Sequence, residues 1–579
     1  MRKQLFSIKT LIALFSFFAL FAAGAQRAYA NANIVILVND GPGEGFNDPT
    51  PAAPVGGNPG ATLGAQRLYA FQYAANVWGA TLDSPETIYI VAAFDPLAPN
   101  VLGSAGAWDV FSDFTPSGNF PGPEFAQTWY GSALADKRAG HDLDNTAPDI
   151  NARFSSNFNF YLGVDNNHGA QNDLVAVLLH EFAHGLGFQN FVNEADGSNL
   201  GGFTDGTRFY PVQTDIFARH TLDTTTGQTW DVMTQAERAA SAVRYGRVVW
   251  NGPAVTADLP SVLSLGSPEV RVISPASIAG AYQFGTAAFG PTIQSSNVTA
   301  PVIDAQDAAN AAGPATTDGC TAFTNAAAVA GKIALVERGT CGFAVKARNA
   351  TNAGAVGVII YNQLANVNAA PPGMAGDGVN DPFVTIPAAS MIRADGLAIL
   401  AQVPGGVSAH MGSDPSIRAG ADSLGRARLY MPFPVAPGSS GSHYDTIAFR
   451  NLLMEPAINP DLTHSVKAPE DLTLELLRDV GWFPDADNDG VADGADCNPN
   501  SNLSPTVVIG GCNTGVPNTL FTNGCTISDN IQQIGATAKN HGAFASSVAA
   551  YANSLKKSGL ITDAQKDAIQ SCAGSAKIP

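Results

Sequence analysis

Charge is scarce in this chain of 579 residues, and positive charge is the scarcer sign. Only 14% of the residues are charged, and 30 lysines and arginines stand against 49 aspartates and glutamates, so the net charge is −19. Proteins that bind nucleic acid or anionic membranes need basic patches to neutralise phosphate groups. The balance argues against both kinds of partner and is typical of a soluble exported protein.

Long apolar runs are absent beyond the N-terminus. After residue 30 no stretch approaches the roughly 18 apolar residues that suggest a membrane-spanning helix. Residues 1–30 have the parts of a signal peptide: basic Arg2, Lys3 and Lys9, an apolar core at 11–23, and small residues before a cleavage site after Ala30. We therefore expect a secreted, extracellular protein without a transmembrane segment after signal cleavage.

Cysteine is absent between residues 31 and 319, which excludes thiolate metal ligands and disulfides from that part of the chain. The six cysteines all come later: Cys320, Cys341, Cys497, Cys512, Cys525 and Cys572. An even number in an exported chain predicts three disulfides. Sequence alone allows many pairings, and grouping by domain favours Cys320–Cys341, Cys497–Cys512 and Cys525–Cys572.

One motif carries chemistry, and it lies in residues 175–190, which read VAVLLHEFAHGLGFQN. If this stretch is helical, His180 and His184 stand four residues apart on one face and can bind one metal ion together. Glu181 lies beside them, where its carboxylate can take a proton from a water that the metal activates. The same pattern also occurs by chance in many helices, so its surroundings decide the interpretation.

The surroundings favour a buried metal-binding helix. Asn172 or Asp173 can cap its start, and the apolar residues before His180 leave hardly any face polar. Two histidines and a glutamate on a buried helix need partners, which a metal ion supplies. Gly185 and Gly187 then end the helix and let the chain turn away.

His180-Glu181-x-x-His184-x-x-Gly187 resembles the motif of the metzincin zinc endopeptidases. Most metzincins place a third histidine three residues after the glycine, but this chain has Asn190 there, a poor zinc ligand. The leishmanolysin-like branch carries an insertion instead and supplies its third histidine beyond it, shortly before a methionine turn. His443, followed by Met454 in a Leu-Met-Glu-Pro sequence, resembles that arrangement.

The resemblance implies a catalytic Zn²⁺ held by three histidines, with Glu181 as general base and Met454 as an apolar floor under the metal. The implied zinc ligands are His180, His184 and His443. The local alternatives for the third ligand are Asn190, Glu194 and Asp196, but the spacing of the two acids matches no family pattern.

The sequence before the motif predicts an α+β fold. Residues 33–38 and 86–93 are rich in isoleucine and valine and predict strands, 68–78 has helical apolar spacing, and 154–162 alternates aromatic and polar residues like a half-exposed strand. A strand, a helix and further strands before the metal helix make an α+β arrangement.

Residues 265–425 are predicted to form an inserted domain. Within it 332–337 and 356–361 predict strands around a helix at 343–352, which makes a βαβ unit punctuated by glycines. The run VERGTCGFAVKARNATNAGAVGVIIYN closely resembles the protease-associated (PA) domain, an α/β module. That family implies a non-catalytic domain that gates substrates or binds partners, and an inert lid is the alternative. Lys346 is expected on the exposed face of the helix.

An acidic segment, 484–515, and a helical segment, 525–579, end the chain. The acidic residues have EF-hand spacing and resemble a thrombospondin type 3 calcium repeat. They are Asp485, Asp487, Asp489, Asp493 and Asp496. Carboxylates packed so densely repel one another without a cation, so we expect a structural Ca²⁺ and not a solvated acidic linker. Apolar stripes at helical spacing in the last segment predict a small all-α module.

We interpret the chain as a secreted zinc metalloendopeptidase that hydrolyses peptide bonds in proteins or peptides. Residues 31–264 and 426–483 would form its metzincin-like α+β domain, which the PA domain interrupts. Two rivals remain: a zinc aminopeptidase, because PA domains also accompany exopeptidases, and a non-catalytic calcium-dependent surface or adhesion protein. A pure binding protein does not need a base such as Glu181 beside its metal ligands, which argues against the last.

Overall fold

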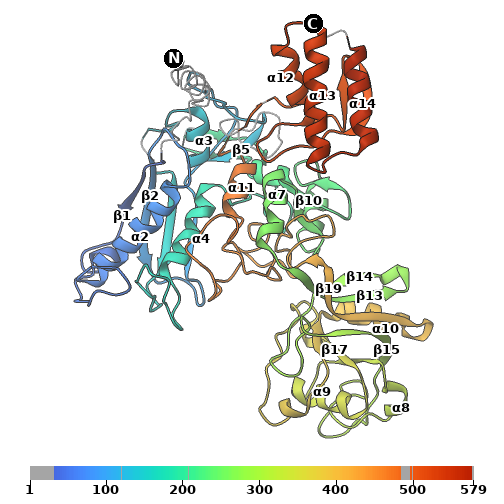
Figure 1. Cartoon of the computed structure of the whole chain (residues 1–579). Helices are drawn as coiled ribbons and strands as arrows, with labels where there is room; N and C mark the ends of the chain where they lie inside the picture. Colours follow the sequence, from blue (N-terminus) through green and yellow to red (C-terminus); the bar gives the residue numbers. More distant parts are fainter. Residues whose placement is uncertain are drawn as a thin grey trace, which may run out of the picture. The chain divides into compact units, whose positions relative to one another are not determined.

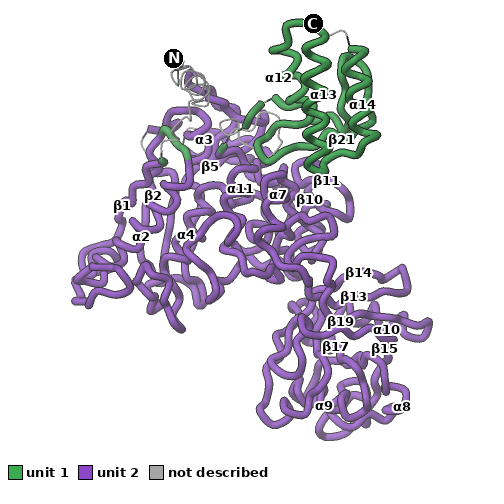
Figure 2. The backbone as a smooth tube through the Cα atoms, in the orientation of Figure 1, with its two compact units in different colours: residues 1–31, 83–85, 483–579 green, residues 32–82, 86–482 purple. Residues whose placement is uncertain are grey.

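The computed structural model describes residues 31–576 apart from 119, 146, 207, 484–495 and 499. The predicted signal peptide, residues 1–30, lies outside the described residues. So do four of the predicted calcium ligands, Asp485, Asp487, Asp489 and Asp493. The chain divides into two compact units, which are residues 32–82 with 86–482, and residues 1–31 with 83–85 and 483–579 (Figure 2). No helix in the described ranges has the length and apolar character that crossing a bilayer requires.

A four-stranded sheet with the order β1-β2-β6-β3 lies in the larger unit. β1 (Ile34–Val38), β2 (Ile88–Asp95) and β6 (Ile150–Ser155) run parallel, and β3 (Gly103–Ala107) pairs antiparallel with β6 at the edge. Isoleucine and valine fill β1 and much of β2 because their branched side chains fit the extended backbone. β3 contains only glycine, alanine and serine, so no bulky side chain stands out from this edge.

Two helices, α2 (Leu63–Gly79) and α4 (Leu174–Leu186), pack against this sheet and against each other (Figure 1). Their shared core centres on Phe71 of α2, which is fully buried. The Phe71 ring centroid lies 4.8 Å from that of Phe154 in β6 and 5.9 Å from that of Phe182 in α4. These aromatic contacts hold α4 at a fixed position on the sheet.

The strand predicted at 154–162 is wrong beyond its first two residues, because β6 ends at Ser155. The chain then turns and reaches α4 through a loop. Phe160 and Tyr161 are adjacent and both buried, so the side chains do not alternate between two faces as they would in a strand.

The insert is a seven-stranded sheet with the order β14-β13-β19-β15-β16-β17-β18. Its first long strand, β13 (Leu265–Ser274), pairs antiparallel with its last strand, β19 (Val407–Arg418). Just outside this pair, the amide of Ala419 donates to the carbonyl of Ser264 at 2.9 Å. The insert therefore enters and leaves at one point, and joining its ends costs the rest of the unit little entropy.

The predicted βαβ unit of the insert consists of β16 (Ile333–Glu337), α9 (Phe343–Asn352) and β17 (Gly357–Tyr361), with the strands parallel. Lys346 of α9 is fully buried, so the expected exposed position was wrong. Its ammonium donates to the carbonyl of Asp318, 28 residues earlier in the chain, and burial lowers the pKa of Lys346 to about 8. Helix periodicity cannot reveal a partner that distant.

After the insert the chain returns to the first part of the unit. The amide of Leu429 donates to the carbonyl of Val248 at 3.0 Å. α11 (Thr473–Asp479) packs against α7 (Pro253–Val262). Trp482 then donates its indole N–H to the carbonyl of the last residue of α4 at 2.6 Å. The returning segment is thus attached to the same helix that carries the histidine motif.

The described part of the smaller unit contains a β-hairpin next to the segment 525–579, which was predicted to be helical and holds three helices. The elements are β20 (Thr506–Ile509), β21 (Cys512–Pro517), α12 (Ile527–Thr537), α13 (His541–Lys557) and α14 (Asp563–Ser575). Val507, Ile509 and Val516 of the hairpin share one core with the apolar faces of the helices. The helices alone leave that core uncovered. The hairpin therefore belongs to the core, although its residues fall largely within the predicted calcium segment, 484–515.

Three disulfides are present: Cys320–Cys341, Cys497–Cys525 and Cys512–Cys572. The expected pairs Cys497–Cys512 and Cys525–Cys572 were therefore wrong. Grouping by domain missed the hairpin, because β21 packs on α14 and so brings Cys512 to Cys572.

Asp136 of α3 (Ser132–Ala139) and Asp149 form a buried carboxyl pair next to β2. The amide of Leu143 donates to Asp136 Oδ1 at 3.0 Å, and the amide of Tyr89 donates to Asp149 Oδ2 at 2.7 Å. Burial raises the pKa of Asp136 to about 9, and its hydrogen bond to Asp149 adds to the rise. The Asp136 carboxyl is therefore protonated at neutral pH and donates to Asp149.

A folded pKa above the ordinary value of 3.8 means that the contribution of Asp136 to stability is complete below pH 3.8 and is lost as the pH rises through about 9. Asp136→Asn keeps a neutral donor at this position. Its free energy of unfolding, measured by urea titration, should therefore fall less between about pH 7 and pH 10 than that of the wild type. Asp205→Asn, at an exposed position, serves as the control and should follow the wild type. Equal slopes for Asp136→Asn and the wild type would contradict the shared proton.

Candidate active site

α4 is buried along its whole length, and both of its ends are fixed. At the start, Asp173 Oδ1 accepts from the amide of Val175 at 2.9 Å, and Asp173 Oδ2 lies 2.8 Å from Nε2 of His464, which is thus a partner of the cap. At Gly185 the neighbouring strand passes so closely that a Cβ would lie 2.4 Å from a β6 side chain. Gly187, with φ +130°, ends the helix in a conformation that favours glycine.

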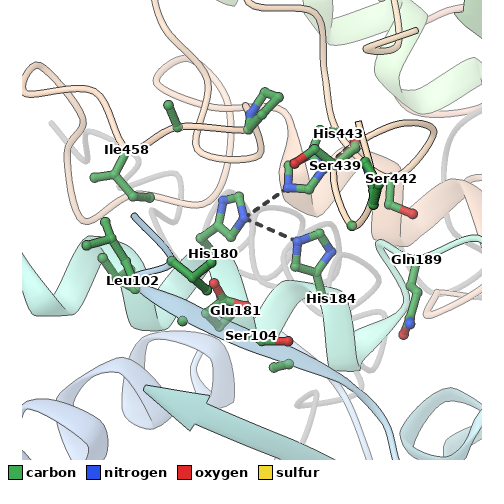
Figure 3. A pocket seen from close by; sticks show the side chains of 18 of the residues that line it. Leu102, Ser104, His180, Glu181, His184, Gln189, Ser439, Ser442, His443 and Ile458 are labelled. Atoms are coloured by element: carbon green, nitrogen blue, oxygen red, sulfur yellow. Dashed lines mark hydrogen bonds between the residues drawn. The ribbon is translucent and has the colours of Figure 1, made fainter. Parts of the chain in front are cut away.

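Three histidines point their Nε2 atoms at a common centre (Figure 3). Nε2 of His180 lies 3.2 Å from Nε2 of His184 and 3.2 Å from Nε2 of His443. Among the described residues these three side chains form the group of metal-binding type, with ligand atoms all within 4.8 Å of one another. His443 reaches this place although it is 263 residues from His180 in sequence.

The other ring nitrogen of each histidine is bonded to a backbone carbonyl. The pairs are His180 Nδ1 with Leu453 O at 2.7 Å, His184 Nδ1 with Phe188 O at 2.7 Å, and His443 Nδ1 with Ser439 O at 2.8 Å. A carbonyl oxygen only accepts, so each Nδ1 carries the hydrogen and each neutral ring turns an Nε2 lone pair towards the centre. Burial lowers the pKa of His180 to about 4 and that of His184 to about 3, which keeps these rings neutral at pH 7.

Three lone pairs directed at one another repel unless a cation lies between them. Neutral imidazoles in such a set, each held by a hydrogen bond from its second nitrogen, are the usual arrangement around a bound transition metal. The donor set therefore fits a metal of the zinc type, with three nitrogen ligands and room for a fourth position.

Glu181 lies between the histidines and the edge strand β3 (Figure 3). It is buried, and this raises its pKa to about 8, while a hydrogen bond from the backbone of Ala105 acts in the opposite direction. β3 comes so close that a Cβ on Gly103 would lie 2.9 Å from Glu181 Oε1. A cation at the histidine centre favours the charged carboxylate, so Glu181 is placed to accept and release a proton there.

The turn at Met454 is bonded to the segments of both His180 and His443. Met454 is fully buried, and its carbonyl accepts from the amide of Tyr444 at 2.8 Å, beside His443. The carbonyl of the preceding Leu453 accepts from His180. The turn thus links the segment of His180 to that of His443.

Asp471 is a residue of the site that the sequence did not reveal. Its Oδ2 accepts from the amide of Leu453 at 2.7 Å, and its Oδ1 accepts from the amide of Thr473 at 2.7 Å. Asp471 thus fixes the peptide whose carbonyl orients His180. The only local signal was its place just before α11, which is ordinary for a helix cap.

The local alternatives for the third ligand lie outside the histidine group. Asn190 donates through Nδ2 to Ser442 Oγ at 2.9 Å and to Glu194 Oε1 at 3.1 Å. It therefore ties the end of the α4 region to the residue just before His443. Asp196 is exposed.

A cleft of about 710 Å³ passes over the three histidines and Glu181. β3 forms one wall, and residues 437–440, 442, 443 and 456–458 form much of the other. The apolar side chains that line the cleft include Leu102, Phe158, Val177, Val192 and Ile458. The polar ones include Gln189, Asn190, Glu194 and Ser442. Figure 3 shows Leu102 and Ile458 on one side of the histidines and Gln189 and Ser442 on the other.

Comparison with known proteins identifies the insert. Residues 298–399 match the family model described as PA domain. The matched segment lies inside the seven-stranded sheet that begins at β13 and ends at β19. The predicted PA domain is thus confirmed.

Similar curated proteins share only short segments with this chain. ER degradation-enhancing alpha-mannosidase-like protein 3 of Homo sapiens is 45% identical over 86 residues, 14% of this chain and 9% of the relative. An aminopeptidase of Pseudomonas aeruginosa is 50% identical over 70 residues, 12% of this chain and 13% of the relative. Probable leucine aminopeptidase 2 of Aspergillus fumigatus is 32% identical over 100 residues, 17% and 19%. The chain therefore spans less than a fifth of these relatives.

Solved structures give weaker similarities. BSAP, a zinc aminopeptidase from Bacillus subtilis, has 22% sequence identity and a TM-score of 0.18, covering 28% of this chain and 35% of that one. The subtilisin-like protease Apa1 from an Antarctic Pseudoalteromonas has 19% identity and a TM-score of 0.19, covering 27% and 34%. The family that the comparisons identify is the PA domain, and it covers residues 298–399 of this chain.

Proposed function

We propose that this chain is a zinc-dependent endopeptidase of the metzincin type, most similar to the leishmanolysin-like branch. The observation that carries the proposal is the convergence of three Nε2 lone pairs from His180, His184 and His443 beside the buried carboxylate of Glu181. Three neutral histidines with an open fourth position are a ligand set of catalytic zinc. The resemblance of the motif and of the Met454 turn supports the same assignment.

Zinc, when bound, supplies a Lewis acid that polarises the scissile carbonyl and makes water more acidic. Glu181 accepts the proton of the attacking water and then passes it to the nitrogen of the leaving amine. The histidines hold their orientation through the carbonyls of Leu453, Phe188 and Ser439.

The edge strand β3 supports an internal cut in a longer peptide. β3 pairs with β6 on one side, and Gly103, Ser104 and Ala105 line the cleft on the other. An extended peptide can add to such an edge through backbone hydrogen bonds, which are independent of its sequence. The cleft continues on both sides of the histidines, so such a peptide has room before and after the cut bond.

An aminopeptidase is the second candidate, since two of the relatives carry that name. The assay that separates the two uses matched peptides with a free or an acetylated N-terminus. An endopeptidase cleaves the acetylated peptide at an internal bond, whereas an aminopeptidase requires the free amine and releases one residue at a time.

Glu181→Gln tests the assigned base. The amide cannot take a proton, so kcat on an acetylated peptide should fall about a thousandfold. Zinc content, measured by metal analysis after gel filtration, should stay at one ion per chain because Glu181 is not a ligand. A variant with wild-type turnover would contradict the mechanism, and a variant that loses its zinc would make Glu181 a ligand instead.

Asp471→Asn tests the support of His180. The new amide would set an N–H against the N–H of Leu453 and loosen the carbonyl that orients the ring, so the zinc Kd should rise about tenfold. The measurement is competition with a chelator of known affinity. His443→Ala should lose most of the zinc, and Asp461→Asn, an exposed change in the same segment, should lose none. An unchanged Kd for Asp471→Asn would remove Asp471 from the site.

A further inference from the structure

Glu194 is the acidic side chain of the cleft that the proposed reaction does not use. No lysine or arginine is among the described residues that line the cleft. Burial raises the pKa of Glu194, and the negative charge of Asp215 adds to the rise, whereas hydrogen bonds from the Glu194 backbone and from the side-chain amide of Asn190 lower it. No positive charge in the described chain contributes. The cleft thus holds a partly buried carboxyl group whose side-chain partner among the described residues is a neutral amide.

A glycine lies next to this carboxyl group. Gly441, with φ +79°, belongs to the loop that forms the opposite wall of the cleft. A Cβ there would lie 2.9 Å from Glu194 Oε1 and 2.5 Å from Asn190 Nδ2. The loop therefore passes next to Glu194 without placing a side chain over it, and the cleft stays open at this end.

The position of Glu194 along the cleft follows from β3. Near the start of β3, Gly103 and Ala105 lie beside Glu181. At the end of β3, the amide of Ala107 donates to Gln189 Oε1 at 3.2 Å. Glu194 is joined to Asn190, the residue after Gln189, so it lies beyond the C-terminal end of β3.

The direction of a bound peptide decides which part of it meets Glu194. Antiparallel pairing is the more stable way for a strand to add to an edge. A peptide antiparallel to β3 has its N-terminal side at Ala107 and its C-terminal side at Gly103. The acyl side, meaning the residues before the cut bond, therefore lies at the end of the cleft that contains Glu194.

We propose that Glu194 binds a cationic group on the acyl side of the substrate. The group is an ammonium or guanidinium, and it comes either from a lysine or arginine side chain or from a free α-amine at the peptide's N-terminus. This assignment rests on the proposed peptidase function and names a specificity-determining residue for it. A carboxylate that is partly desolvated and lacks a cationic partner gains more from an arriving cation than an exposed one does.

The test compares peptides that differ in one charge. Acetylated peptides carry lysine or its neutral isostere norleucine at each of the positions before the cut bond, and a further pair carries neutral side chains with a free or an acetylated N-terminus. For the wild type, the cationic member of one of these pairs should have a kcat/KM about tenfold higher. In Glu194→Gln, which keeps an oxygen for Asn190, that preference should disappear.

A preference for lysine in acetylated peptides would make the side chain the source of the cation, and a preference for the free N-terminus would make it the α-amine. Asp196→Asn, an exposed change two residues away, should keep the wild-type preference. Equal preference in the wild type and Glu194→Gln would overturn the proposal even if both cleave neutral peptides.

Binding separates this proposal from the proposed function. Glu181→Gln and the double variant Glu181→Gln/Glu194→Gln can be titrated with the same peptides, with Kd measured by fluorescence anisotropy. A tenfold tighter Kd for the cationic peptide, lost in the double variant, supports Glu194 even if the wild type hydrolyses nothing. Absence of hydrolysis would then count against the peptidase assignment alone, and equal Kd values would count against Glu194 alone.

Discussion

The orientation of three imidazole rings is the constraint on which this site depends. Each ring is turned by one backbone carbonyl, and the carbonyls come from separate places: Phe188 just after α4, Leu453 in the Met454 turn and Ser439 in the loop before His443. Because every Nδ1 donates outwards, every Nε2 must face inwards. The protein thus concentrates three lone pairs in a buried place, where only a cation can relieve their repulsion.

Several hydrogen bonds around the site fix the backbone segments that carry those carbonyls. Asp471 fixes the peptide of Leu453, Asn190 ties the α4 region to Ser442, and Trp482 bonds to the last carbonyl of α4. The Asn190–Ser442 and Trp482–Leu186 bonds join segments on either side of the insert in sequence, whereas Asp471 and Leu453 both follow it. The histidine centre is therefore also the place where the two separated pieces of the domain are joined.

The sequence predicted the features that depend on the spacing of residues close together in the chain. His180, Glu181 and His184 share one helical turn, so their proximity could be predicted from the motif, and the βαβ unit followed from strand and helix periods. His443 could be found only through a family resemblance, because no local pattern predicts a contact across 263 residues.

The errors were of the same kind. Lys346 was predicted to be exposed because its partner carbonyl lies on another segment. Two disulfides were paired wrongly because the packing of β21 on α14 is not visible in the sequence. Asp471 was missed because its role is to bond the amide of Leu453, and the sequence does not show that these two residues lie close together.

The hydrogen bond between Ser264 and Ala419 indicates how a gene of this kind could gain or lose the inserted domain. Two residues that are already neighbours can be linked by a short turn or by a whole domain, and the remaining residues need not change. Acquisition or loss of the PA domain at this point would leave the histidine centre's two halves in register. Natural variants of the chain that lack the segment between these residues would then be expected to fold around the same three imidazoles.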